Sequence, residues 1–206
     1  MKFKNVFLIG ILSLSLVLSG CAHSSAPMLD QASITNGIPS HWKTYSDEKY
    51  GYSIRYPENF EINTENEMTE RKDPGTSVKF VFPESFVKTL PEATVSVSAQ
   101  PGVCANLVQA NNGVKKQESV TKNSLVYDVY TLEEGAAGSI YSTIYYTTVK
   151  NNICYQVEFF VRETRPENYA NNDVEKQLLQ EEHSAALSGS NLIFEKMLES
   201  FSIKSV

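Results

Sequence analysis

Side chains of the kind that build metal centres and nucleophilic sites are scarce in this sequence. Its 206 residues include three cysteines and three histidines. A thiol nucleophile needs a base, most often histidine, but His41 and His183 lie near opposite ends of the predicted domain. One helical turn from His183 stand Leu179 and Leu187, neither of which binds a metal, so we expect this histidine on a solvated helix face. The sequence predicts no catalytic residue, no metal ligand and no cofactor.

A surplus of positive charge is also missing. Lysine and arginine number 18 against 24 acidic residues, which gives a formal net charge of −6. Loss of the first residues, predicted below, removes Lys2 and Lys4 and leaves −8, that is, −6 minus 2. Proteins that bind nucleic acids need cations to displace counterions from phosphates, and polybasic adhesion to anionic lipid needs them too. We therefore expect no nucleic-acid partner, and membrane attachment must come from another source.

Long apolar runs are lacking as well. The longest run, Val6–Leu18, covers about 13 residues, and Lys2 and Lys4 precede it without an acidic residue. A helix of that length rises roughly 20 Å, whereas the hydrocarbon core of a bilayer is about 30 Å thick. This disfavours a permanent transmembrane anchor. A basic start followed by a short apolar core is typical of a signal peptide.

The apolar run leads into Leu18-Ser19-Gly20-Cys21. This order of aliphatic, small, small and cysteine resembles the lipobox of bacterial lipoproteins. The resemblance implies that a signal peptidase recognises Leu18, Ser19 and Gly20, that the chain is cut before Cys21, and that Cys21 carries acyl groups. Two or three acyl chains give durable membrane anchoring, whereas one binds marginally. Ala22, in place of aspartate, implies the outer membrane if the cell has two.

Three segments follow from this reading. Residues 1–20 are the predicted lipoprotein signal peptide. Residues 21–40 are the predicted acylated cysteine and flexible tether, because they are small and polar and show no lasting period. Residues 41–206 are predicted to form a single domain, since no repeat and no second change of composition divides them.

Alternating apolar side chains predict a domain rich in antiparallel strands. Tyr50–Tyr56 carries aromatic or aliphatic side chains at every second position and ends at Pro57, which cannot donate to a ladder. Shorter alternating segments follow at 60–62, 78–82 and 95–99. Three longer segments rich in β-branched and aromatic residues lie at 124–132, 139–149 and 153–162. The links 133–138 and 150–152 suit hairpins, so we predict that these three segments form an antiparallel meander.

Helices are fewer. They are predicted at 103–110, 173–187 and 191–200. Asn172 and Glu175 have the spacing of a capping box at the start of the second helix, and Val174, Leu178 and Ala185 share one of its faces. The last helix has an apolar stripe that comprises Phe194, Met197, Leu198 and Phe201. A final short strand is predicted at 201–204.

Cys104 and Cys154 are the only cysteines after Cys21. In an exported protein such a pair predicts a disulfide, with two buried thiols as the alternative. A bridge would close a loop of about 50 residues and stabilise the fold by roughly 4 kcal/mol in the chain-entropy model. On the predicted strand 153–162, Cys154 shares a face with Gln156, Glu158 and Phe160. The segment around Cys104 could cover that face.

Two segments at the ends of the domain, YGYSIRYPENF at 50–60 and FEKMLESFSI at 194–203, resemble the ends of PsbP-like domains. PsbP is the lumenal protein of the photosynthetic oxygen-evolving complex, and a Ran-binding import factor shares its fold. The resemblance implies an α+β fold, an antiparallel β-sheet flanked by helices in an α/β/α sandwich. It transfers no residue for handling manganese, calcium or chloride.

Two functions are compatible with these observations. The first, which we favour, is a membrane-anchored envelope lipoprotein whose domain is a non-catalytic binding or assembly module for an envelope protein. The tyrosine-rich strands could then supply the contact, through Tyr141, Tyr145 and Tyr155, although packing of the sheet under helices would explain them too. The second is an envelope enzyme, or a protein that binds a small ligand or metal at a site assembled from scattered residues.

Overall fold

The computed structural model describes residues 41–64, 75–83, 90–104 and 113–204. The predicted signal peptide, the lipobox with Cys21, the tether and most of the helix predicted at 103–110 lie outside these residues. Among the helices that the structure describes, none contains a stretch long and apolar enough to cross a bilayer.

A small antiparallel sheet joins the two ends of the domain. Its strands, in the order β1-β2-β11, are β1 (Lys43–Asp47), β2 (Tyr52–Tyr56) and β11 (Ser202–Ile203). The turn between β1 and β2 requires Gly51, whose φ of +64° lies in the left-handed region. Gly51 donates its N–H to the Asp47 carbonyl at 2.9 Å and accepts from the Lys204 N–H at 2.8 Å. This turn therefore fastens the last residues of the described chain to the first strands.

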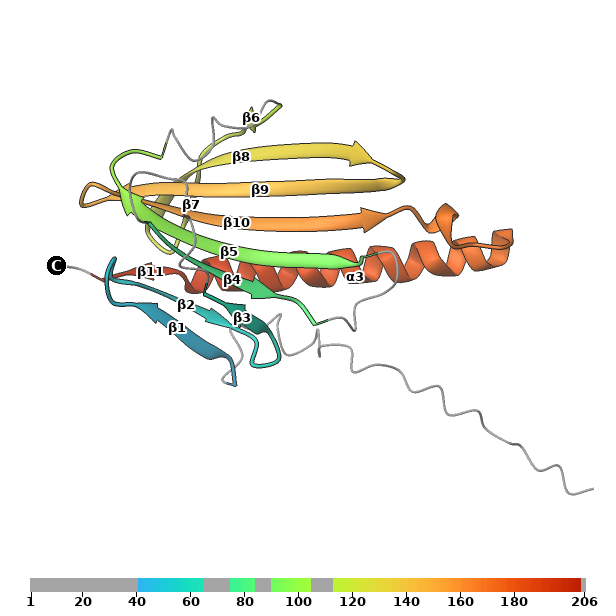
Figure 1. The fold of residues 1–206 in the computed structure, drawn as a ribbon, viewed down its shortest axis with the longest axis horizontal. Coiled ribbons are helices and arrows are strands. Elements are labelled where there is room, and N and C mark those ends of the chain that lie inside the picture. Colours follow the sequence, from blue (N-terminus) through green and yellow to red (C-terminus); the bar gives the residue numbers. More distant parts are fainter. Residues whose placement is uncertain (1–40, 65–74, 84–89, 105–112, 205–206) are drawn as a thin grey trace, which may run out of the picture.

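The second sheet is eight-stranded and antiparallel throughout, with the order β3-β4-β5-β10-β9-β8-β6 (Figure 1). The short strand β7 (Val120–Lys122) also pairs with β8. The strands along the main path are β3 (Glu61–Asn63), β4 (Thr76–Val81), β5 (Glu92–Pro101), β6 (Lys115–Lys116), β8 (Leu125–Ala136), β9 (Ser139–Lys150) and β10 (Ile153–Thr164).

The predicted meander of β8, β9 and β10 is confirmed, with tighter connections than expected. Strand β8 runs on to Ala136, so only Ala137 and Gly138 turn the chain into β9. Asn151 and Asn152 make the equivalent turn between β9 and β10. All four turn residues have positive φ, between 50° and 78°, as two-residue turns that match the twist of a hairpin require.

One face of the large sheet forms the core of the domain. In β5 and β10 every second side chain is apolar and buried on that face, because successive residues of a strand point to opposite sides. These side chains are Val95, Val97, Ala99, Tyr155, Val157, Phe159 and Val161. The small sheet adds Tyr52, Ile54 and Tyr56 to the same cluster.

A single helix, α3 (Asp173–Ser200), lies along this apolar face (Figure 1). It replaces the two helices predicted at 173–187 and 191–200, because the chain stays helical between them, where Ser190 Oγ donates to the Leu187 carbonyl at 2.9 Å. The predicted cap is confirmed in part. The Asn172 side chain accepts from the Glu175 N–H at 2.9 Å, but the Glu175 carboxylate accepts from Asn171.

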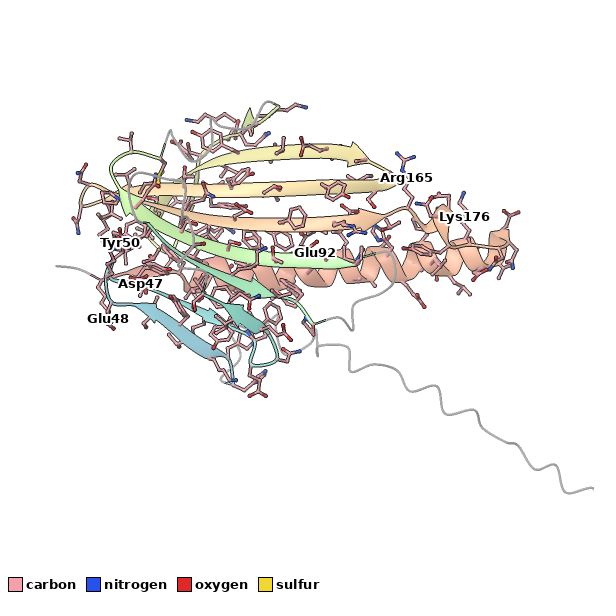
Figure 2. All side chains as sticks on the ribbon, viewed as in Figure 1. Asp47, Glu48, Tyr50, Glu92, Arg165 and Lys176 are labelled. Carbon is pink, nitrogen blue, oxygen red and sulfur yellow. A yellow bond between two sulfur atoms is a disulfide. The ribbon has the colours of Figure 1, made fainter. Side chains whose placement is uncertain are left out.

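The buried residues of α3 all lie in its second half. They are Ser190, Ile193, Phe194, Met197 and Leu198. The Phe194 ring stacks on the Phe159 ring of β10, with centroids 4.6 Å apart and planes 8° from parallel. Figure 2 shows that the β1–β2 turn, with Asp47, Glu48 and Tyr50, lies at the opposite end of the molecule from Arg165 and Lys176.

The α+β class and the antiparallel sheet are thus confirmed, with a helix on one face of the large sheet. Strand β1 was not predicted, since Tyr45 and its neighbours lack a run of alternating apolar residues. Proline ends β2 as expected, at Pro57.

Candidate functional site

The outer face of the large sheet, opposite α3, carries polar side chains in its central strands. Gln156 of β10 is only 6% exposed. It is paired in register with Ser98 of β5 and Thr147 of β9, which are also buried. Hydroxyl groups therefore surround this amide in the middle of the sheet.

Gln156 and Glu158 form the centre of this polar region. Gln156 Nε2 donates to Glu158 Oε2 at 3.3 Å, while Gln156 Oε1 is buried and has no hydrogen-bond partner among the described residues. Burial raises the pKa of Glu158, an effect that the positive charge of Lys79 and the bond from Gln156 partly offset. A half-buried carboxyl with a raised pKa next to an unpaired acceptor can hold a proton or bind a polar group.

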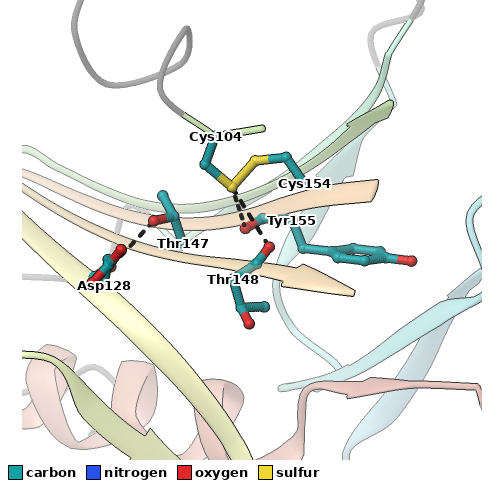
Figure 3. The surroundings of a disulfide bond; sticks show 6 residues. All are labelled: Cys104, Asp128, Thr147, Thr148, Cys154 and Tyr155. Atoms are coloured by element: carbon teal, nitrogen blue, oxygen red, sulfur yellow. Dashed lines mark hydrogen bonds between the residues drawn. A yellow bond between two sulfur atoms is a disulfide. The ribbon is translucent and has the colours of Figure 1, made fainter. Parts of the chain in front are cut away.

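The predicted disulfide is present beside this region (Figure 3). It joins Cys104, just after β5, to Cys154 at the start of β10, and Cys154 is fully buried. Cys104 Sγ lies 3.5 Å from the Thr148 carbonyl oxygen and 3.9 Å from that of Tyr155. Because a disulfide sulfur carries no hydrogen, these are contacts without hydrogen bonding. The bridge holds the chain that follows β5 against the outer face of β10.

The three tyrosines predicted to contact a partner have different surroundings. Tyr155 is 2% exposed and points into the core, where its hydroxyl donates to the Tyr50 carbonyl at 2.8 Å. It is a core residue, and we remove it from the predicted contact. Tyr145 lies on the outer face and is buried. Tyr141 is on the same face and half-exposed, with its ring centroid 6.4 Å from that of Phe160.

His183 lies in a different setting from the one predicted. Instead of a fully solvated helix face, it occupies a partly buried position where its Nε2 lies 3.0 Å from Glu163 Oε2 at the end of β10. This contact fastens the first half of α3 to the sheet. Within the residues that the structure describes, no group of three His, Cys, Asp or Glu side chains could hold a metal ion.

Sequence reasoning did not single out the polar centre of the outer face or the Glu163–His183 pair. The alternation in β10 placed Gln156 and Glu158 on one face, which was a usable signal. Their burial could not be predicted from the sequence, because it depends on the side chains that neighbouring strands place beside them.

Comparisons with known proteins give structural likeness only. No family model and no curated protein matches the sequence. A solved protein from Bacteroides thetaiotaomicron is 14% identical over 80% of this chain, with a TM-score of 0.44; the chain spans 49% of that structure's length. Cyanobacterial PsbP from Synechocystis sp. PCC 6803 is 12% identical over 81% of this chain and 95% of that chain, with a TM-score of 0.41. The Saccharomyces cerevisiae Ran-binding protein Mog1p is 11% identical over 79% of this chain and 95% of that chain, with a TM-score of 0.47.

The disulfide should contribute measurably to stability. It closes a loop with a sequence separation of 50, so the double substitution Cys104→Ser/Cys154→Ser should lower the free energy of unfolding by about 2–4 kcal/mol. Chemical denaturation followed by circular dichroism measures the difference. Reduced wild-type protein serves as the control and should unfold at the same denaturant concentration as the double variant. Equal stability of the oxidised wild type and the double variant would contradict the prediction.

Glu158 should make stability depend on pH. Because its pKa is raised in the folded state, this carboxyl favours folding when protonated and loses that contribution as the pH rises above about 4.5 through the folded-state pKa. Glu158→Gln should therefore match the wild type below pH of about 4 and become the more stable protein at neutral pH. Denaturation curves across this range test it, with Glu133→Gln at the exposed end of β8 as control. A stability difference between Glu158→Gln and the wild type that stays constant with pH would exclude the raised pKa of Glu158 as its cause.

Proposed function

We propose that this protein is a membrane-anchored envelope lipoprotein whose domain is a non-catalytic binding or assembly module. The lipobox Leu18-Ser19-Gly20-Cys21 carries the proposal. Acyl groups on Cys21 anchor the chain, and the tether at 21–40 leaves the domain free to move near the membrane, with a reach of roughly 25 Å. If the cell has two membranes, the anchor lies in the outer one.

The roles of the most reactive side chains in the described domain support binding over catalysis. Cys104 and Cys154 are joined to each other, so neither is a free thiol. The His183 ring contacts Glu163 at 3.0 Å and fastens α3 to the end of β10. These groups stabilise the framework, which is what a module that presents a rigid surface needs.

The contact surface includes Tyr141 on the outer face of the large sheet. Its ring lies beside that of Phe160, and Arg162 is its cross-strand partner. Tyrosine, phenylalanine and arginine are enriched in protein interfaces because their side chains offer a large contact area, to which tyrosine and arginine add a polar end. All three are half-exposed.

A second candidate is the binding of a small polar ligand on the same face. One observation favours it: Gln156 Oε1, beside Glu158, is buried and has no hydrogen-bond partner in the described part of the chain. A ligand that donates a hydrogen bond would satisfy this acceptor.

Lipidation can be tested directly. Cells grown with radiolabelled palmitate should incorporate the label into the wild-type protein and not into Cys21→Ser, because the thiol of Cys21 is the acceptor. Gel autoradiography of the immunoprecipitated protein measures incorporation. Cys104→Ser/Cys154→Ser is the matched control and should keep the label. Undiminished labelling of Cys21→Ser would contradict the proposed lipid anchor at Cys21.

The contact at Tyr141 calls for a separate experiment. Tyr141→Ala should reduce crosslinking of the protein to its envelope partner in intact cells by about tenfold, since a central aromatic contact contributes on that scale. Mass spectrometry of crosslinked adducts measures the yield. Ile62→Ala, at an exposed apolar residue of β3, is the control. Equal yields from both variants would exclude Tyr141 from the contact.

A further inference from the structure

The first half of α3 extends beyond the sheet and is exposed. In Figure 1 its first turns continue past the ends of β8, β9 and β10. This half comprises about 17 residues and is roughly 25 Å long. None of its residues, from Asp173 to Gly189, is buried. Its last turn, with Ala186 and Leu187, packs against the core, and the turns before it carry the exposed apolar side chains described next.

Two apolar side chains on this half are open to solvent. Val174 is 71% exposed and Leu178 is 56% exposed. They are four residues apart and so lie next to each other on one helix face. Tyr169, just before the helix, is exposed as well. We call Val174 and Leu178 the helix-end patch.

Polar contacts hold the helix end in place. The Asn172 cap and the bonds from Asn171 to Glu175 Oε2 close its first turn. Lys176 contacts Glu167 of the 3₁₀ turn η1 (Pro166–Asn168) at 3.3 Å. Asn168 Nδ2 donates to the Gly138 carbonyl in the β8–β9 turn at 3.0 Å. The helix-end patch is thus presented on a fixed support, which lowers the entropy cost of binding.

The surroundings of the patch are acidic. Residues 163–183 contain six carboxylates and two cations. The carboxylates are Glu163, Glu167, Asp173, Glu175, Glu181 and Glu182; the cations are Arg165 and Lys176. The helix end therefore combines exposed apolar side chains with a negative potential.

We propose that the helix-end patch docks a cationic amphipathic segment of another envelope protein. This deepens the proposed function, on which it rests, by naming the chemistry of the partner. Lysine or arginine side chains of the segment face Glu181 and Glu182, and its apolar side chains cover Val174 and Leu178.

Charge distinguishes a cationic protein segment from three other possible occupants of the patch. Anionic lipid would be repelled by the carboxylates. A symmetric second copy would bring the same acidic patch against itself. The chain's own tether, 22–40, contains no lysine or arginine, so it offers no complementary charge. A cationic protein segment is the occupant that satisfies both the apolar stripe and its rim.

The test uses the whole mature chain from residue 21, with Cys21→Ser so that no lipid is attached. The probe is a synthetic 18-residue helix of lysine and leucine with one apolar face. A glutamate–leucine counterpart is the control peptide. Val174→Ser/Leu178→Ser removes the patch. Val126→Ser/Val149→Ser is the matched control, because these valines are exposed to a similar degree, 63% and 52%, on β8 and β9.

Fluorescence titration should show binding of the lysine–leucine peptide that weakens as salt is added. The affinity should fall by about tenfold or more in Val174→Ser/Leu178→Ser, and stay within about twofold of the wild type in the control variant. Circular dichroism checks that both variants remain folded. Because this chain carries no lipid, failure here leaves the palmitate result on Cys21 untouched, and the two can be told apart.

Five results would overturn the proposal. The peptide fails to bind, or binds both variants equally. The glutamate–leucine peptide binds as well as the lysine–leucine peptide. The chain cosediments with phosphatidylglycerol vesicles through the same two residues, which would assign the patch to lipid. Sedimentation velocity shows a dimer that Val174→Ser/Leu178→Ser abolishes, which would assign it to a second copy.

Discussion

The contact between the second half of α3 and the inner face of β10 is the interaction on which the rest of the domain depends. Phe194 stacks on Phe159, and β10 lies between β5 and β9 in the centre of the large sheet. The same helix ends at Ser200, and the next residue, Phe201, has its ring 5.7 Å from that of Tyr52 in β2. One apolar stripe therefore holds the large sheet, the helix and the small sheet together, and the disulfide fastens the opposite face of β10.

This packing determines which side chains remain for function. From Tyr155 to Val161 every second residue of β10 is committed to the core, so Gln156 and Glu158 lie on the outer face, while Glu163 follows at the end of the inner face and contacts His183. The buried residues of the helix begin at Ser190, with Ala186 and Leu187 packed against the core just before them, so the first turns present Val174 and Leu178 to solvent. The sheet face with Tyr141 and the helix-end patch are two surfaces produced by a single constraint.

Sequence alternation predicted most strands and the meander, because these depend on local pattern. The cysteine count predicted the disulfide, and the resemblance to PsbP-like domains implied the α+β class. The prediction that Tyr155 contacts a partner shows a limit of that reasoning. The two-residue turn at Asn151–Asn152 pairs Tyr155 with Thr148, and Tyr145 with Glu158, so the two tyrosines lie on opposite faces of the sheet. The register of the hairpin would have separated them. The burial of Glu158 and the single long helix required tertiary contacts that no local pattern encodes.

The exposed apolar residues of α3 are not needed to keep it helical. The Asn172 cap is worth about 1 kcal/mol, and the exposed Glu167–Lys176 pair adds little. The Glu163–His183 contact joins the same segment to β10. Polar side chains in place of Val174 and Leu178 would leave the cap, the ion pair and the histidine contact intact, and they would suit a solvated helix face better. Under the proposal, their apolar character reflects a contact outside the chain, and the carboxylates around them favour a cationic partner.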